Sequence, residues 1–203
     1  MTEQGMLIVV SGPSGVGKDT IVRLFLETTA DCVLSVSATT RSPRQGEQEG
    51  IDYFFVDHSA FEALIANGEM LEHAKYGNNY YGTPKKAIDT LLAQGKNVIL
   101  VIEVNGAMLI RKMRPDAVLV FLIPPTWETL EQRLQGRGTE TPEQVQTRLQ
   151  AARGELAEAD KYDYIVVNNT IEQCVHDFSV VMEAAKHSAR RMYHYLKEAF
   201  PQC

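Results

Sequence analysis

The residues best suited to chemistry form a glycine-rich run near the start of the chain, Gly12-Pro-Ser-Gly-Val-Gly-Lys18. Glycines at the spacing GxxxxGK let successive backbone N–H groups converge on phosphate oxygens, and the lysine reaches the β- and γ-phosphates. The run therefore predicts a site for a nucleoside triphosphate. The predicted contacts are Ser11, Gly12, Pro13, Ser14, Gly15, Val16, Gly17, Lys18, Asp19 and Thr20.

The position after Lys18 departs from the usual motif. It normally holds a Ser or Thr whose hydroxyl binds Mg²⁺, but here it is Asp19, followed by Thr20. One interpretation is that Asp19 coordinates Mg²⁺ itself, directly or through water. The other is that its charge only favours the N-terminus of the following helix, a contribution of about 0.3–1 kcal/mol.

Arginines form two further clusters. Arg41 and Arg44 lie three residues apart and can clamp a dianionic phosphate, because guanidinium groups donate in a planar fork. Alone, this pair fits a solvated surface loop better. Beside a phosphate loop and the second cluster, anion binding is favoured. The second cluster is Arg133, Arg137 and Arg148.

These residues need elements to position them, and strand-length apolar runs alternate with helical patterns along most of the chain. The predicted strands are 6–11, 32–36, 97–102, 117–123 and 164–167, and the predicted helices are 18–28, 60–66, 85–93, 126–134, 142–159 and the segment from 171. Near-continuous apolar strands indicate a sheet covered on both faces, hence a parallel sheet flanked by helices in an α/β fold. The polar segment 37–83, with a strand at 53–56, predicts an inserted substrate-binding subdomain, and 136–143 predicts a lid.

Composition sets limits on the class of protein. The 203 residues, 44% of them apolar, suit one domain with a sizeable core, and the net charge of −6 disfavours nucleic acid as a partner. The cysteines are Cys32, Cys174 and Cys203, an odd number without a CxxC pair, which indicates free thiols. No signal peptide and no membrane-length apolar run is present, so a cytoplasmic location is expected and no membrane partner.

Several separate motifs resemble those of the guanylate kinase family, in the family's order and spacing. The first is the glycine-rich run 12–18, a P-loop. The others are residues 35–47 (SVSATTRSPRQGE), Asp52-Tyr53, Glu72, residues 79–83 (NYYGT), 103–106 (EVNG) and 133–141 (RLQGRGTET). The resemblance extends from the P-loop to about Asn169 and implies a P-loop NTPase-type fold. The implied single domain has its core at 1–36, 84–135 and 146–203, a GMP-binding subdomain at 37–83 and a lid at 136–145.

The resemblance implies a GMP site made of Ser37, Arg41, Arg44, Glu47, Tyr53, Glu72, Tyr81, Thr83 and Glu103. Glu72 matches the family position that accepts the two adjacent donors of guanine, its N1–H and 2-amino group, with Ser37 and Thr83 as hydroxyls at the base. Adenine lacks that donor pair and would leave the carboxylate unpaired. Without the resemblance, Glu72 would be interpreted as an exposed helix acid.

On the ATP side, the resemblance adds Arg133, Arg137 and Asn168 to the P-loop, with Asn168 expected near the adenine. It assigns catalysis to Lys18, Arg41, Arg137 and Arg148. The family usually ends its middle strand with two acids, but here the first is Val101 and the second is Glu103, which is expected to bind Mg²⁺ through water or to contact the acceptor.

The implied activity is transfer of the γ-phosphoryl group of ATP to GMP or dGMP, with Mg²⁺, in purine nucleotide metabolism. One alternative is a related kinase with another acceptor, such as a ribose bisphosphate, since those kinases also have Asp after the P-loop lysine. Another is an inactive protein-binding module, which typically loses the lysine or the acceptor arginines. This chain keeps Lys18, Arg41 and Arg44.

Overall fold

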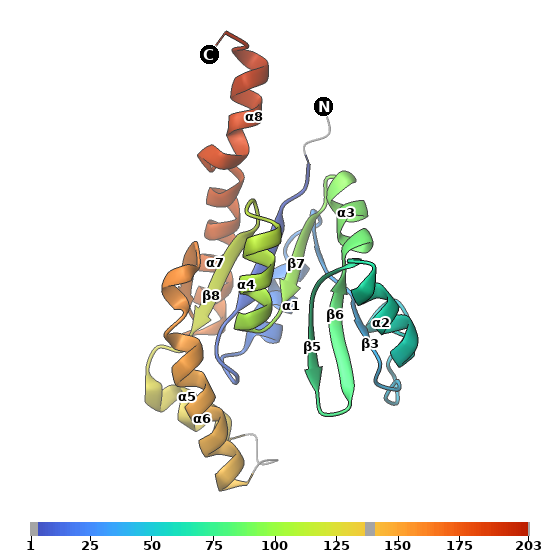
Figure 1. The fold of residues 1–203 in the computed structure, drawn as a ribbon. Coiled ribbons are helices and arrows are strands. Elements are labelled where there is room, and N and C mark those ends of the chain that lie inside the picture. The colour runs from blue at the N-terminus through green and yellow to red at the C-terminus, as the bar shows by residue number, and fades with distance from the viewer. Residues whose placement is uncertain (1–3, 137–140, 203) are drawn as a thin grey trace.

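The centre of the molecule is a five-stranded parallel sheet with the strand order β2-β7-β1-β8-β9 (Figure 1). The structure is a computed structural model that describes residues 4–136 and 141–202. The strands of this sheet are β1 (Leu7–Ser11), β2 (Cys32–Leu34), β7 (Asn97–Val101), β8 (Val118–Ile123) and β9 (Tyr164–Val167). All neighbouring strands are parallel, so their carboxyl ends share one edge, where α/β folds bind ligands.

Helices cover both faces of this sheet. Along β1, Ile8 and Val10 pack toward α1 (Lys18–Glu27) and α7 (Ile171–Lys186), whereas Leu7 and Val9 pack toward the opposite face. The helices of that face are α3 (Lys85–Ala93) and α4 (Val104–Met113). Because both faces of β1 are buried, every residue of the strand is buried and only its last, Ser11, is polar.

A second, four-stranded sheet stands beside the first, with the order β4-β3-β6-β5 (Figure 1). Its elements are β3 (Ser37–Thr39), β4 (Tyr53–Phe55), the helix α2 (His58–Ala66), β5 (Met70–Tyr76) and β6 (Asn79–Pro84). Phe61 of α2 is fully buried and packs with Ala38 and Met70 in a separate small core. The segment therefore has its own sheet and its own core.

Two further helices lie at the lower left of Figure 1 and pack on each other. They are α5 (Trp127–Gln135) and α6 (Pro142–Leu156), joined through Leu130, Leu134 and Leu149. Thr141 caps α6 in a reciprocal capping box with Gln144, a strong local start signal. A short 3-10 helix, η1 (Ala159–Lys161), follows α6, and α8 (Ala189–Ala199) extends from the top of the molecule.

The predicted α/β fold with a parallel sheet is confirmed, and the five predicted strands of the central sheet match within about two residues. Three strands and one helix were not predicted: β3, β5, β6 and α4. The strands β5 and β6 are polar because one side of them lines a cavity instead of a core. The helix α4 starts at Val104 and carries Asn105 and Gly106 in its first turn, both weak helix formers.

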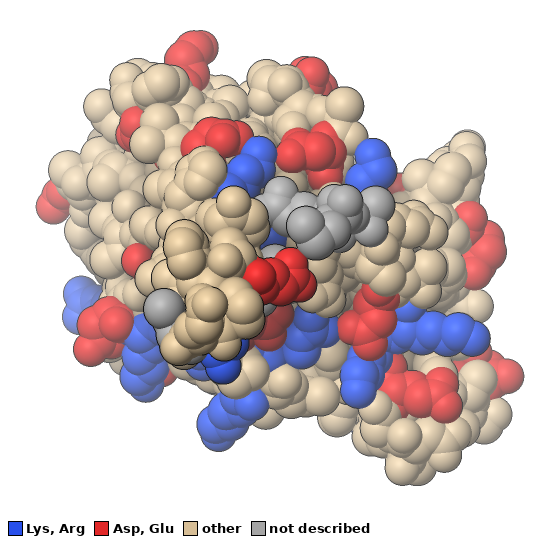
Figure 2. Space-filling view, turned by 90° about the horizontal axis from the view of Figure 1, so that it is seen from above, with Lys and Arg blue, Asp and Glu red and all other residues tan. Residues whose placement is uncertain are grey.

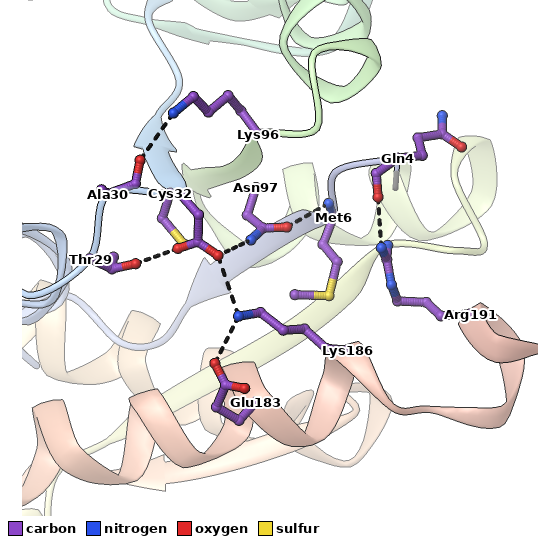
Figure 3. Close-up of polar contacts among 11 residues, drawn as sticks. Gln4, Met6, Thr29, Ala30, Cys32, Lys96, Asn97, Glu183, Lys186 and Arg191 are labelled. Carbon is purple, nitrogen blue, oxygen red and sulfur yellow. Dashed lines mark hydrogen bonds and ion pairs between the residues drawn. The ribbon is translucent and has the colours of Figure 1, made fainter. Parts of the chain in front are cut away.

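The end of the molecule far from the carboxyl edge is held by polar contacts (Figure 3). Asp31 accepts hydrogen bonds from Thr29 and Asn97 and pairs with Lys186 of α7 at 3.3 Å. Arg191 donates to the backbone oxygen of Gln4 at 2.7 Å. These contacts tie α7 and α8 to the starts of the central strands.

The same end, seen from above in Figure 2, shows acidic and basic side chains intermingled on one face.

Cys32 and Cys174 are free thiols buried in the core, and burial raises the pKa of each to about 11. Cys203 lies outside the described residues. Among the described residues, no helix combines the length and apolar character needed to span a bilayer.

Candidate active site

The phosphate loop connects β1 to α1 at the carboxyl edge of the central sheet. Gly12 has φ +147°, and a Cβ there would lie 2.2 Å from the backbone oxygen of Leu122, so only glycine fits. Gly17 has φ +94° and caps α1, directing the free N–H groups of the first turn into the loop. Lys18 Nζ donates to the backbone oxygens of Gly12 at 2.6 Å and Pro13 at 3.3 Å. The lysine is thus folded over the loop, where it would meet phosphate oxygens.

Two predicted ATP residues support this loop from behind. Asn168 Nδ2 donates to the backbone oxygen of Val16 at 2.7 Å, and Arg133 Nη1 donates to the same oxygen at 3.4 Å. Arg133 Nη2 also donates to the backbone oxygen of Asn168 at 3.0 Å. Asn168 is buried, with Oδ1 without a hydrogen-bond partner. Both side chains hold the backbone that forms the cradle.

Glu155 of α6 is a site residue that the sequence motifs did not indicate. Its Oε2 accepts a hydrogen bond from the backbone N–H of Ser14 at 3.3 Å. Burial, followed by the negative charge of Glu103, raises the pKa of Glu155, while Ser14 and Lys18 act in the opposite direction. The helical periodicity could have indicated this position, because Glu155 comes three residues after the buried Ala152 and so lies on the inward-facing side of α6.

Between the two sheets lies a cavity of about 410 Å³, large enough for a mononucleotide. Predicted acceptor residues line it, together with residues that were not predicted. The predicted ones are Ser37, Tyr53, Glu72, Tyr81 and Glu103. The others include His73, Tyr76, Asn105, Gly106 and Leu109. The cavity therefore brings together segments far apart in the sequence.

Glu72 lies on β5, not on a helix, and only 8% of it is exposed. Its Oε1 accepts a 2.6 Å hydrogen bond from the hydroxyl of Thr83, which is also buried. Burial raises the pKa of Glu72, and the hydrogen bond from Thr83 lowers it by less. A buried carboxylate with unused acceptor capacity favours a ligand that offers hydrogen-bond donors.

The predicted phosphate clamp is organised around Glu47. Arg41 donates to both carboxylate oxygens of Glu47, at 2.7 and 3.0 Å, and the backbone N–H of Arg44 donates to Glu47 at 2.7 Å. The hydrogen bonds from Arg41 and then from Arg44 lower the pKa of Glu47. Arg41 also lies over the ring of Tyr53, 5.4 Å from its centroid. Glu47 therefore holds the side chain of Arg41 and the backbone of Arg44, and its predicted place in the GMP site stays a prediction.

Glu103 stands at the start of α4, opposite Tyr76 at the end of β5. Burial, then the charge of Glu103 and a hydrogen bond to it, raise the pKa of Tyr76 to about 12. The ring of Tyr76 meets that of Tyr81 edge-on, with centroids 6.0 Å apart. Val101, which replaces the usual acid, lines the same cavity. The second sheet and the core thus face each other through these side chains.

The lid arginines are described in part. Arg148 lies on α6 and is partly buried, on the helix that also carries Glu155. Arg137 lies outside the described residues, as do residues 138–140 of the predicted lid 136–145. Its predicted role therefore has no structural counterpart here.

The described residues contain no cluster of three or more His, Cys, Asp or Glu side chains able to enclose a metal ion. Asp19 is exposed in the first turn of α1, and Glu103 is exposed at the cavity. This donor set fits Mg²⁺ carried in by the phosphates of a nucleotide, because that ion keeps several waters and takes only one or two carboxylates. The same set would suit poorly an ion held by protein ligands alone.

The structure combines a phosphate loop at the carboxyl edge of a parallel sheet with a cavity that contains a buried carboxylate, Glu72, and a tyrosine, Tyr53, covered by Arg41. This combination defines a P-loop kinase for a small acceptor. The comparisons with known proteins specify the family. A family model described as guanylate kinase matches residues 4–185. The chain belongs to the guanylate kinase family.

Individual relatives are similar to this chain over nearly its whole length. Guanylate kinase from Clostridium perfringens is 44% identical over 196 residues, 97% of this chain and 91% of that protein. Guanylate kinase from Carboxydothermus hydrogenoformans is 45% identical, covering 93% of each chain. The crystal structure of guanylate kinase from Anaplasma phagocytophilum superposes with a TM-score of 0.75 at 34% identity, covering 98% of this chain and 97% of that one.

Proposed function

We propose that the protein transfers the γ-phosphoryl group of ATP to GMP by in-line attack. A phosphate oxygen of GMP forms a bond to the γ-phosphorus while the bond to the β,γ-bridging oxygen breaks, releasing ADP and GDP. No general base is needed, because the attacking oxygen is already anionic. The observation that carries this proposal is the buried Glu72–Thr83 pair, whose carboxylate lines a cavity at the carboxyl end of β7, the neighbour of the strand that leads into the phosphate loop.

The donor side binds by backbone and charge. The loop N–H groups and Lys18 receive the triphosphate, while Asn168 and Arg133 hold the loop in shape. Arg137 and Arg148 add positive charge where negative charge develops in the transition state. Asp19, with Glu103 through water, would hold Mg²⁺, which on binding would neutralise charge on the phosphates.

The acceptor side binds through side chains. Glu72 accepts both guanine donors, with Thr83 and Ser37 as hydroxyls at the base. Arg41 and Arg44, positioned by Glu47, clamp the GMP phosphate, and Tyr53 and Tyr81 add phenolic donors. Closure of the subdomain 37–83 and the lid 136–145 onto the core would exclude water, which would otherwise hydrolyse ATP.

An assay of ADP release with one acceptor at a time tests this function. GMP, dGMP, AMP, UMP and a ribose bisphosphate would each be supplied with Mg-ATP. We expect turnover with GMP and dGMP and little with the others, because only guanine satisfies Glu72. Preferred use of the ribose bisphosphate would instead indicate the other kinase class, and no turnover with any acceptor would indicate a binding module.

A further inference from the structure

We propose that Gly106 is a specificity-determining residue of the acceptor site, because its missing side chain allows α4 to fix the carboxylate of Glu72. This proposal rests on the proposed role of Glu72 as the residue that recognises guanine. Gly106 belongs to the core and Glu72 to the second sheet, so the contact joins the two bodies that enclose the cavity.

The contact is close. A Cβ at position 106 would lie 3.2 Å from Glu72 Oε2 and 3.3 Å from Ile102 Cδ1. Ordinary contacts of a Cβ are longer than this, so any side chain at 106 would push the carboxylate by a few tenths of an ångström. The approach of the carboxylate, and not the backbone, therefore disfavours a side chain at this position, because Gly106 has no positive φ.

One oxygen of this carboxylate accepts a hydrogen bond, and the other lies close to α4. Thr83 of β6 donates to Oε1 at 2.6 Å, and the first turn of α4 lies against Oε2 at Gly106. That turn contains free N–H groups, because α4 begins at Val104 and its N-cap, Glu103, makes no side-chain cap. Glu72 Oε2 thus lies beside the N-terminal turn of a helix, the end that favours a nearby negative charge.

A carboxylate bonded at one oxygen and packed closely at the other can meet two adjacent donors with little reorganisation. Hydrogen bonds in an enclosed site lose strength when an acceptor is displaced or turned, and small errors in position lower rates strongly. The geometry of β5 against α4 would thus set how well the chain distinguishes guanine from bases without that donor pair. The substitution of interest is Gly106→Ala.

The chain offers a matched control in Gly154, which also lies within a helix, α6. Nothing lies within 4 Å of a Cβ added at Gly154. Both Gly→Ala changes should favour their helices by a similar amount, up to about 1 kcal/mol, so neither variant should fail to fold. Only Gly106→Ala should change the acceptor site.

The test measures KM for GMP and for ATP in Gly106→Ala and Gly154→Ala, each with and without Glu72→Ala. We expect Gly106→Ala to raise KM for GMP about 5-fold, a fraction of the roughly 100-fold loss that a 1 Å misplacement can cause, with KM for ATP unchanged. Gly154→Ala should change neither value. In the Glu72→Ala background, Gly106→Ala should have no further effect, because there is no carboxylate left to displace.

Three results would overturn the proposal. Gly106→Ala could behave like Gly154→Ala, which would show that the contact is not used. It could raise KM for GMP by the same factor with and without Glu72, which would show that it acts by another route. If Glu72→Ala alone leaves GMP use unchanged, the role of Glu72 itself is wrong, and that outcome is visible without any change at Gly106.

Discussion

The two sides of the active site are built from different parts of the chain. The proposed donor side is one loop, residues 12–18, whose backbone N–H groups and one lysine would bind phosphate. The proposed acceptor side is a cavity between two sheets, lined by side chains from β3, β4, β5, β6 and the start of α4. A backbone site is defined by a short run of sequence, whereas a side-chain site depends on how distant segments pack. Substitutions should therefore separate the two sides.

The largest expected effect is on the donor side. Lys18→Ala should abolish measurable transfer, a loss of at least about 10³-fold in kcat, because a preorganised charged donor is removed from the transferring group. The fold should persist, because Lys18 is only partly buried and donates to the carbonyls of Gly12 and Pro13 in its own loop. Steady-state kinetics with a melting curve would measure both. Near-normal turnover would contradict the assignment of the phosphate loop.

On the acceptor side, Glu72→Gln should lower kcat/KM for GMP by roughly 30- to 900-fold. The amide accepts one guanine hydrogen bond but opposes the second donor with its own, a loss of about 2–4 kcal/mol. The KM for ATP should stay the same. Initial rates with each substrate varied in turn would show this, and an unchanged kcat/KM for GMP would remove Glu72 from the base site.

Asn168 supports the phosphate loop without belonging to it, so its substitution should have a smaller effect than substitution of Lys18. Asn168→Asp keeps the shape but places an acceptor against the backbone oxygen of Val16, at an expected cost of about 1–3 kcal/mol of folding free energy. KM for ATP should rise and KM for GMP should not. Calorimetric melting and kinetics on the same preparation would measure the two effects. If only the KM for GMP changed, the assignment of Asn168 to the donor side would be wrong.

Much of this division could be predicted from the sequence. The loop 12–18 is local, so its motif predicted its position between a strand and a helix, which the structure has as β1 and α1. Glu72 was identified only through the resemblance, because nothing near it in the sequence shows that β5 is buried against α4. Gly106 and Glu155 act on residues 34 and 141 positions away, respectively, and no local pattern encodes such contacts. Local sequence motifs therefore predict the contacts of one loop, but not the contacts between side chains of separate elements.

The ionised carboxylate of Glu72 should also reduce the stability of the fold, because it is buried. Burial raises the pKa of Glu72 above its usual value of 4.5, so the folded chain binds this proton more tightly than the unfolded chain. Its contribution to stability is therefore complete at low pH and is lost as the pH rises above 4.5. Glu72→Gln should raise the melting temperature at pH 7 by roughly 2–4 °C, the shift produced by about 1 kcal/mol. At pH 4 the two proteins should melt together, and a lower melting temperature for the variant at pH 7 would contradict this.

The smallest expected effect concerns Asp19. If the acid of the magnesium site has moved from position 101 to position 19, Asp19→Ala should raise the Mg²⁺ concentration for half-maximal activity by roughly 3- to 5-fold, under 1 kcal/mol. Adding Val101→Asp should restore part of that loss. If Asp19→Ala titrates with Mg²⁺ like the parent and loses only thermal stability, Asp19 serves the helix N-terminus alone.

The separation of the two sides is tested most directly by a crossed binding experiment. GMP and ATP would each be titrated calorimetrically into the parent, Lys18→Ala and Glu72→Gln. We expect Lys18→Ala to weaken ATP and leave the Kd of GMP within about 2-fold, while Glu72→Gln weakens GMP by at least about 30-fold and leaves ATP unchanged. Comparable weakening of both nucleotides by either substitution would contradict a donor site made by the loop and an acceptor site made by side chains.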